Sequence, residues 1–449
     1  MADVVQGVAP GGTDDRFLPA VDPLPAGLVS WSLPHRIFFR FVFNYLVLYC
    51  AYSLRFLPGG SWLAQPYDNL WRAICPWVAI HVFGLSGPVT TYFVTGSGDT
   101  TLEYIQSICY LVAAIAATIV WSLADRRRAS YRVLHDWLRI LVRYTLAFTL
   151  FGYGFAKVFP LQFRAPTFAR LIERYGDFSP MGVLWQFMGA STAYIVFSGA
   201  MEVLGGALLL LRRTTLLGAM VCCAVLANVV ALNFCYDVPV KLYSSHLLLM
   251  AVFLGAPDLR RLLNLLVWNR SAAPADLSEP RFQRRNLRLA VVVFQLVCIG
   301  NVLYDNLNGS WKRYRETYIN PPRQPLHGLY EVESFARNGA EMPPLTSDRT
   351  RWSKLIVDGR SGFSVRMMDE SPKFFGTDYD AATSTVRLLD PGGAKVGALT
   401  YSRPDPDHVL LSGSLGGAPL AVRLRRVDTA RFLLIGRGFH WISEYPFNR

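Results

Sequence analysis

Residues 182–235 read GVLWQFMGASTAYIVFSGAMEVLGGALLLLRRTTLLGAMVCCAVLANVVALNFC, and this stretch decides the fold. It consists of two apolar runs, 182–211 and 214–235, which are separated only by the dipeptide Arg212-Arg213. A helix of about 20 apolar residues crosses the hydrocarbon core of a bilayer. Each run is therefore long enough to span a membrane, and together they predict a helical hairpin with a positively charged turn.

The composition of the whole chain agrees with a membrane protein that has a substantial soluble part. Of its 449 residues, 52% are apolar and 17% are charged, whereas ordinary soluble domains carry roughly 25% charge. The mean hydropathy is +0.26. These figures exclude a disordered chain, a coiled coil and an ordinary cytosolic enzyme. The net charge of +13, from 45 basic and 32 acidic residues, indicates either an acidic partner or charge sorted across a membrane.

Seven apolar segments predict a transmembrane bundle of about seven helices. They cover residues 37–56, 103–124, 137–158, 182–211, 214–235, 241–256 and 287–305. We divide this part of the chain into two N-terminal helices with their connection (31–136), a four-helix core (137–256), and a basic loop with the seventh helix (257–307). Residues 1–30 contain Gly, Pro and Asp without the basic and apolar regions of a signal peptide, so we expect a disordered cytoplasmic tail.

Basic residues between these segments predict the orientation. The loop DRRRASYR (125–132), the turn Arg212-Arg213 and seven arginines between 260 and 288 fall on one side of a seven-helix protein, which the positive-inside rule places in the cytoplasm. We therefore expect a bacterial inner-membrane protein with a cytoplasmic N-terminus and a periplasmic C-terminal domain. Topology explains most of the excess charge, so the lipid bilayer is the expected partner and a nucleic acid is not.

The connection 57–100 is expected on the outer face of the membrane. It is rich in aromatic residues, which favour the headgroup level of a bilayer. Among them are Trp62, Tyr67, Trp71, Trp77 and Tyr92. This composition predicts a helix lying on the outer surface at 66–84.

From residue 352 onward the pattern changes to short apolar runs separated by Gly, Asp and Pro. Runs such as WSKLIVD, STVRLL and APLAVRLRR alternate with turns such as DGRSG, DPGGAK and RPDPD. This pattern is typical of antiparallel strands joined by hairpins. About seven strands over 352–449 predict a small periplasmic all-β domain, either a sandwich or an up-and-down barrel. Residues 308–351 look like a Pro-rich connector with a short helical stretch near Tyr330–Asn338.

Ionisable side chains inside the apolar segments are the first candidates for function, because they are costly at membrane depth. Arg143 lies about 9 Å from the cytoplasmic end of the third segment, and Glu202 lies about 14 Å from the cytoplasmic end of the fourth. If those helices are antiparallel neighbours, the two side chains can form an intramembrane ion pair. The pair could simply lock two helices together, or it could handle protons or substrate.

A second group of polar residues is expected at the outer ends of the third, fifth and sixth segments. The sixth segment has only about 16 residues, so we expect the stretch 235–240, which contains Pro239, to enter the membrane as broken backbone lining a wet cavity. The predicted lining residues are Tyr153, Lys157, Asn228, Asn233, Asp237, Lys241 and His246. Their cations suit an anionic or quinone-like oxygen, and an imidazole transfers protons near neutral pH. The alternative is that the lysines extend to the interface with Asp237 as counter-ion.

The seven cysteines and the C-terminal histidine give weaker signals. No zinc or redox spacing occurs, so no metal site is expected. A disulfide between Cys50 and Cys75 remains open. His440, near Arg437 and Glu444, is either part of a ligand site or part of an edge segment that closes the β-domain.

Residues 137–256 resemble the DoxX-like family of four-helix membrane proteins. The resemblance rests on GYGFAKVFP (152–160), MEVLGGALLLLRR (201–213) and FLGAPDLRR (253–261). It implies a membrane component linked to redox or quinone chemistry, with partner proteins and with a quinone as a possible cofactor. The extra helices and the β-domain depart from a plain DoxX-like protein. A helical bundle followed by a β-rich domain is also similar to the layout of vitamin K-dependent carboxylase, although no carboxylase active-site motif is matched.

Three functional hypotheses follow. The first is a membrane component of a redox or quinone-linked complex, which binds a small lipophilic ligand in an outward-facing cavity. The second is a non-catalytic assembly or scaffold subunit that docks a membrane or periplasmic partner protein through its β-domain. The third is a carboxylase-like membrane enzyme. The sequence leaves open whether the protein is catalytic.

Overall fold

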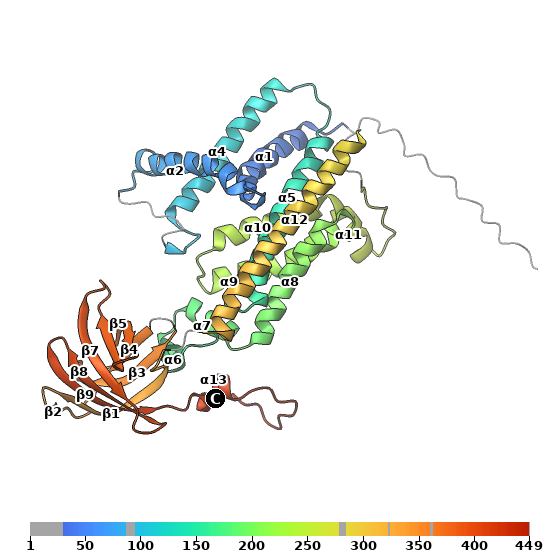
Figure 1. Cartoon of the computed structure of the whole chain (residues 1–449). Helices are drawn as coiled ribbons and strands as arrows, with labels where there is room; N and C mark the ends of the chain where they lie inside the picture. The colour runs from blue at the N-terminus through green and yellow to red at the C-terminus, as the bar shows by residue number, and fades with distance from the viewer. Residues whose placement is uncertain (1–29, 87–94, 278–283, 322–323, 360–361, 449) are drawn as a thin grey trace, which may run out of the picture.

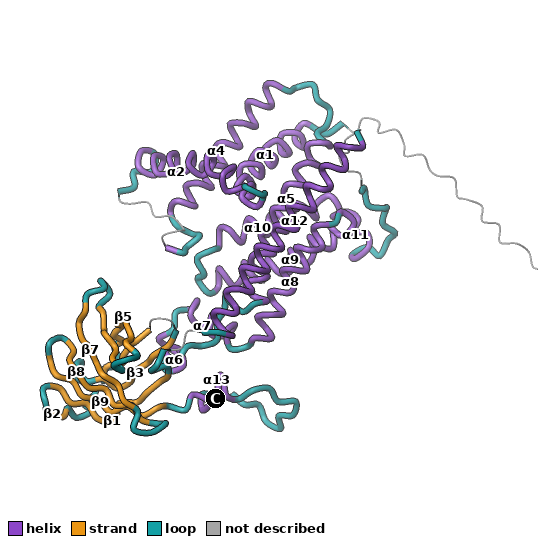
Figure 2. The backbone as a smooth tube through the Cα atoms, viewed as in Figure 1, coloured by secondary structure: helices purple, strands orange, loops and turns teal. Residues whose placement is uncertain are grey.

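The computed structural model describes residues 30–86, 95–277, 284–321, 324–359 and 362–448. It consists of a helical bundle followed by a β-barrel (Figure 1). Almost all of the tail expected at 1–30 lies outside the described residues. Figure 2 shows that the helical bundle and the strands form separate regions, and the strands of the described residues lie between Gly328 and Arg426.

Six helical segments among the described residues are long and apolar enough to cross a membrane. They are Leu33–Phe56, Thr101–Ala124, Thr192–Leu210, Arg212–Cys235, Lys241–Leu266 and Arg285–Ile319. In the order of the chain, the long helices are α1 (Leu33–Cys50), α2 (Gly60–His81), α4 (Thr101–Ala124), α5 (Arg132–Val158), α7 (Pro180–Gly189), α8 (Thr192–Leu210), α9 (Thr215–Cys235), α10 (Lys241–Gly255) and α12 (Arg285–Tyr314). Short helices α6 (Phe168–Leu171), α11 (Leu259–Leu266) and α13 (Leu433–Gly436) lie between or after them.

The third expected span corresponds to α5, which is not among the six apolar helices. It carries charged residues along its length, yet it is the helix with the most buried side chains in the bundle. It packs against α1, α8, α10 and α12. A helix enclosed by other helices can carry charges that a lipid-facing helix cannot, so α5 is the central element of the bundle.

The expected single span 182–211 is wrong, because two helices cover these residues. Ser179 caps the start of α7, with its Oγ accepting a hydrogen bond from the Gly182 N–H, and Ser191 caps α8 in the same way. A Cβ atom on Gly189 would lie 2.1 Å from the carbonyl oxygen of Arg164. The segment between α5 and α7 therefore packs directly against Gly189, where α7 ends. Ser191 then caps the start of α8.

The loops between the helices gather the basic residues at one end of the bundle, which we call the arginine end. There the Trp31 N–H donates to the Ala129 carbonyl, and Arg212 donates to the carbonyl of Asp276. The other end, which we call the barrel end, contains α6, α7 and the link from α12 to the barrel. The connection expected at the outer face contains α2, which packs against α4.

The barrel is formed by antiparallel neighbours in the order of the chain. Its strands are β1 (Gly328–Arg337), β3 (Trp352–Asp358), β4 (Gly362–Met367), β5 (Pro372–Asp380), β6 (Thr385–Leu389), β7 (Lys395–Ser402), β8 (His408–Leu415) and β9 (Ala418–Arg426). Pairing of β1 with β9 closes the ring, and the two-residue β2 (Ala340–Glu341) adds only to β1. The structure thus has an up-and-down barrel and not a sandwich.

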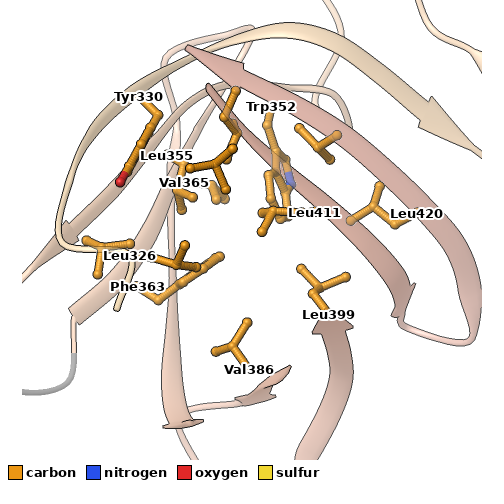
Figure 3. Close-up of a cluster of buried hydrophobic side chains, with 14 of the residues drawn as sticks. Leu326, Tyr330, Trp352, Leu355, Phe363, Val365, Val386, Leu399, Leu411 and Leu420 are labelled. Carbon is orange, nitrogen blue, oxygen red and sulfur yellow. The ribbon is translucent and has the colours of Figure 1, made fainter. Parts of the chain in front are cut away.

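The helix expected near Tyr330–Asn338 is wrong, because these residues form most of β1. The pairing of β1 with β9 shifts register between Val332 and Ser334. This irregularity interrupts the alternation of inward and outward side chains, so the two-residue period of a strand is not visible in the sequence. The barrel therefore begins at Gly328, inside the stretch expected as a connector. Its interior is filled by apolar side chains from all eight ring strands, including Trp352, Leu355 and Phe363 (Figure 3).

Several contacts join the barrel, and the link that leads to it, to the barrel end of the bundle, including the packing of Phe168 against Leu329 and Ile356. The Asp358 carboxylate, at the end of β3, accepts a hydrogen bond of 2.9 Å from the Phe168 N–H at the start of α6. The Tyr318 hydroxyl, just after α12, donates to the Pro160 carbonyl at 2.7 Å. Cys50 and Cys75 are buried as free thiols in two different clusters of apolar residues, so the structure contains no disulfide between them.

Candidate functional site

A buried ion pair lies inside the bundle, between the last turn of α5 and α8. The Lys157 ammonium donates to both carboxylate oxygens of Glu202 at 2.8 Å. The Lys157 and Glu202 side chains are only 8% and 4% exposed, respectively. Two hydrogen-bonded opposite charges compensate each other's loss of hydration in a way that a single charge cannot. The pair is therefore a compensated charged feature in a mainly apolar interior.

A close helix crossing brings these two side chains together. A Cβ atom on Gly199 of α8 would lie 2.6 Å from both the Gly154 carbonyl oxygen and the Lys157 Cβ of α5. Side chains lean toward the N-terminus of their own helix. Because α5 and α8 are antiparallel, Lys157 and Glu202 lean toward each other across this crossing. The glycines thus determine which residues can pair.

The expected Arg143–Glu202 pair is wrong for the same geometric reason. Gly206 of α8 is opposite Ala147 of α5, so Arg143, one turn further along, is level with the end of α8. That level is about 12 Å along the helix from Glu202. Arg143 instead lies at the arginine end, where it shares the lining of a cavity with Arg139, Arg212, Arg213, Asp258 and Arg261.

A cavity of about 530 Å³ lies beside the ion pair. Its walls come from α5, α7, α8, α9 and α10 and from the segments that lead into them. The lining is mostly apolar and includes Leu150, Phe163, Leu184, Trp185, Met188, Phe197, Met201, Val225, Val229, Leu232 and Leu247. A largely apolar cavity with a few convergent polar groups is the usual form of a small-molecule site.

The structure brings four of the seven expected cavity residues into this lining. Tyr153, Lys157, Asn228 and Asn233 all line it, and so does Glu202, which sequence reasoning assigned elsewhere. The Lys157 ammonium lies 5.5 Å from the centre of the Tyr153 ring. Asn233 donates to the Ser244 hydroxyl at 2.9 Å. The lining thus combines a few polar groups with mainly apolar side chains.

Gln162 adds a hydrogen-bond acceptor that sequence reasoning missed. It lines the cavity from the segment that follows α5. Among the described residues, no donor reaches its buried Oε1 atom. A buried carbonyl oxygen without a donor is costly, so a ligand that donates a hydrogen bond here would be stabilised. No periodic pattern marks Gln162, because it lies outside the regular helix.

Asp237 and Lys241 do not line the cavity, which corrects their predicted place. The Lys241 ammonium lies 2.8 Å from an Asp237 oxygen, and the Asp237 side chain is 83% exposed. The Asp99 carboxylate accepts from the backbone N–H groups of Lys241 and Leu242, each at 2.9 Å. Asp99, from the segment before α4, thus caps α10 and fixes the turn after α9.

The backbone between α9 and α10 is irregular, as expected from the short sixth segment. Asp237 has a φ of 51°, and the Val238 N–H donates to the Asn233 carbonyl. Val238, Pro239 and Val240 line the cavity. This irregular turn forms one wall of the site and is held in place by Asp99.

His246 is also displaced from its predicted position. Its Nε2 lies 2.6 Å from the Tyr45 hydroxyl, and its ring stacks on Tyr49 with centroids 4.1 Å apart. Both tyrosines belong to α1. His246 is about 100° of helix rotation from Leu247, which does line the cavity, so it faces α1 and connects α10 to it.

A second, more polar chamber of about 290 Å³ lies on the other side of α10. Its lining includes Arg55, Asp68, Arg72, Glu103 and Gln106, together with several tyrosines. Tyr243 lines both this chamber and the apolar cavity. Its hydroxyl lies 3.2 Å from that of Tyr52. Tyr243 therefore separates a polar space from an apolar one.

Comparison with known proteins identifies one curated relative. The chain is 32% identical over 132 residues to the uncharacterized protein YwoB of Bacillus subtilis, and the match covers 78% of that protein and 27% of this chain. No family model matches the chain, and no solved structure matches it significantly. The DoxX-like resemblance therefore stays a prediction from the three motifs. By its identity to YwoB and its coverage of that protein, the chain belongs to the YwoB family.

Proposed function

We propose that this protein binds a small lipophilic molecule with a hydrogen-bonding head group, inside a seven-helix bundle of a bacterial inner membrane. The observation that carries the proposal is the apolar cavity of about 530 Å³ with the Lys157–Glu202 pair in its wall. The apolar lining suits a hydrocarbon or ring system, whereas the ion pair, Asn228, Asn233 and Gln162 suit oxygen-bearing groups. A quinone meets both requirements and is the first candidate ligand.

The proposed orientation places the arginine end in the cytoplasm and the barrel in the periplasm. The loops that contain Arg128, Arg212 and Arg261 lie at one end of the bundle together with Trp31, near the N-terminus. The positive-inside rule assigns such an end to the cytoplasm. With α5 as the seventh span, an odd number of crossings puts the barrel on the other side. The cavity then lies in the periplasmic half of the bundle.

The proposed route of entry is lateral, from the bilayer. Phe197 of α8 lines the cavity and is 60% exposed, and Asn228 of α9 is exposed as well. These residues lie on helices that are apolar enough to face lipid. A lipophilic ligand is concentrated in the membrane, so an opening between α8 and α9 allows binding without passage through water.

The experiment compares bound lipophiles in purified protein before and after the cavity is filled. Detergent-purified wild type is extracted with organic solvent and analysed by mass spectrometry. Ser198→Trp places an indole in the cavity lining, whereas Ala200→Trp, on the same helix and exposed, is the matched control. We expect one class of lipophile in wild type and A200W that is depleted in S198W. Equal lipophile content in all three proteins would overturn the proposal.

A further pair of variants tests the polar side of the site. Asn228→Leu removes an amide from the cavity, and Ala227→Leu introduces the same residue at an exposed neighbouring position that is not in the lining. We expect N228L to weaken binding of a labelled ubiquinone or menaquinone analogue, and A227L to leave it unchanged. If neither analogue binds wild type but another lipophile is recovered, the quinone assignment fails and the lipophile site remains.

The scaffold hypothesis is favoured by one observation in the barrel. Its interior is filled by side chains such as Trp352, Phe363 and Leu411, so a ligand would have to displace its core. A packed barrel on the periplasmic side suits docking of a protein. The test is chemical cross-linking in cells, followed by purification. The variant reverses the charges of the barrel surface pairs Arg423–Glu333 and Arg425–Glu331. A partner that is cross-linked to wild type and lost in this variant would support docking.

A further inference from the structure

The segment that follows the barrel, residues 433–447, is not needed for barrel closure. β9 ends at Arg426 and pairs directly with β1, so the edge-closing role expected for the RGFHWISEYPFNR stretch is wrong. The segment forms the short helix α13 and an extended stretch that leaves the barrel (Figure 1). Its function must therefore lie outside the barrel fold.

This segment exposes an unusual number of large apolar side chains. Phe439, Trp441, Ile442 and Tyr445 are 77%, 92%, 78% and 84% exposed, respectively. Leu433, Leu434 and Ile435 of α13 are also exposed. Isolated exposed apolar residues are normal on a protein surface, but a contiguous group marks an interaction site. The group is rich in the aromatic side chains that favour the bilayer interface.

The start of the segment is fixed at the barrel end of the bundle. Phe432 packs in a small cluster with Phe168 of α6, with Ile172 just after α6, and with Val427 just after β9. Because α6 lies in the connection between α5 and α7, the chain leaves this cluster beside the ends of the spanning helices. Figure 1 shows the C-terminal segment lying on the same side as the barrel-end termini of α8 and α12.

We propose that residues 433–447 lie in the lipid headgroup layer and tie the barrel to the membrane surface. Position, composition and exposure all favour lipid as the occupant. The Arg437 guanidinium lies 4.0 Å from the centre of the Phe447 ring, so a cation suited to lipid phosphates accompanies the aromatic group. Trp and Tyr rings place an apolar body in the acyl boundary and a polar edge among the headgroups.

The proposal is tested by the depth of a nitroxide spin label in proteoliposomes of phosphatidylethanolamine and phosphatidylglycerol. The full-length parent carries Cys235→Ser, because Cys235 is the exposed native cysteine among the described residues. Trp441→Cys places the label in the segment. Ala394→Cys places it in the exposed β6–β7 turn, at the barrel end remote from Asp358 and α6. The unlabelled parent measures any background from partly buried thiols.

Collision rates with oxygen, which concentrates in lipid, and with a water-soluble nickel chelate are then compared. We expect the ratio of oxygen to nickel collisions to be severalfold higher at position 441 than at 394. A ratio at 441 equal to that at 394 would place the segment in water and overturn the proposal. Low collision rates with both reagents at 441 would also overturn it, because they would indicate a protein partner or a second copy of the chain.

Discussion

The barrel and the bundle both bury apolar side chains, but they differ in what they expose and in the charges that they bury. The barrel buries Trp352, Leu355 and Phe363 and exposes ion pairs such as Arg425–Glu331. The bundle exposes apolar side chains such as Val112, Ile119 and Leu296, and its mainly apolar interior also buries a few charged groups. An exposed apolar surface on the bundle fits a lipid environment, whereas the charged surface of the barrel fits water.

The interior of the bundle shows how a charge is accommodated at depth. Besides Lys157–Glu202, Arg40 of α1 is almost fully buried and donates to the Tyr131 hydroxyl, the Ser122 hydroxyl and the Asp125 carbonyl. Hydrogen-bond partners replace the water that each group loses. In the barrel, by contrast, the charged pairs lie on the outside, where water and salt screen them and make them weak.

The largest effect is expected from breaking the bundle's internal ion pair. Lys157→Met should lower the free energy of unfolding by ~3–5 kcal/mol, because Glu202 would be left buried without its counter-charge. The double variant Lys157→Met with Glu202→Leu should recover most of the loss, since no lone charge remains. Thermal unfolding in detergent measures both proteins. A double variant no more stable than the single one would contradict the ion-pair interpretation.

The equivalent change in the barrel removes apolar volume. Leu355→Ala deletes a fully buried side chain and should cost about 2–5 kcal/mol, from lost burial and the cavity left behind. Leu410→Ala, on the partly exposed side of β8 and 38% exposed, should cost much less. Chemical denaturation followed by near-ultraviolet circular dichroism distinguishes them. Similar losses would mean that the barrel is not held together by its interior.

A smaller effect is expected at the crossing of α5 and α8. Gly199→Ala should destabilise the bundle by about 1–3 kcal/mol, because the added methyl would lie 2.6 Å from the Gly154 carbonyl oxygen. Gly300→Ala in α12 is the control, since nothing lies within 4 Å of its added Cβ. The control should be neutral or slightly stabilising, as alanine favours helix. Thermal midpoints in detergent that fall equally in both variants would contradict close packing at the crossing.

The smallest effect is expected from acid, which protonates aspartates on the barrel. Hydrogen bonds from neighbouring hydroxyl groups lower the pKa values of three aspartates. The donors are chiefly Thr350 for Asp348, Ser371 for Asp369 and Thr383 for Asp380. Because folding lowers these pKa values, the ionised aspartates stabilise the folded barrel at a pH above the ordinary aspartate pKa. This stabilisation is lost as the pH falls through the pKa values of the folded state. The barrel should weaken below about pH 4.

The matched variant for this prediction replaces all three aspartates by asparagine. The triple variant should unfold at a lower temperature than wild type at pH 6, and the difference should shrink at pH 3, where the wild-type carboxylates become protonated. Circular dichroism of the β-signal during heating measures both proteins. A constant difference at the two pH values would show that the carboxylate charge does not contribute.

Much of the fold could be predicted from apolar runs and turn residues, because these patterns are local. The helical hairpin α8–α9 and the strands after Trp352 are of this kind. The pairing of Lys157 with Glu202 could not be predicted, because it depends on where α5 crosses α8, which is determined by Gly154 and Gly199. The residues that line the apolar cavity were predictable where they share a helix face, as with Tyr153 and Lys157.

Other parts escaped prediction because their signals are not periodic. His246 was assigned to the cavity from its place near the start of α10, but one residue of helix rotation turns it toward Tyr45. Asp99 caps α10 from a segment far away in sequence, and no local pattern reveals such a partner. The binding of a lipophile at the predicted site stays a prediction.

The pairing of β1 with β9 has a consequence for how the protein is made. The ring joins Gly328–Arg337 to Ala418–Arg426, so it cannot close until its last strand has reached the same compartment as its first. Contacts between such distant parts of the chain form slowly. If α12 inserts as the last span, the bundle can assemble while the barrel is still an open sheet with two unpaired edges. Newly made chains then require protection from edge-to-edge association during that interval.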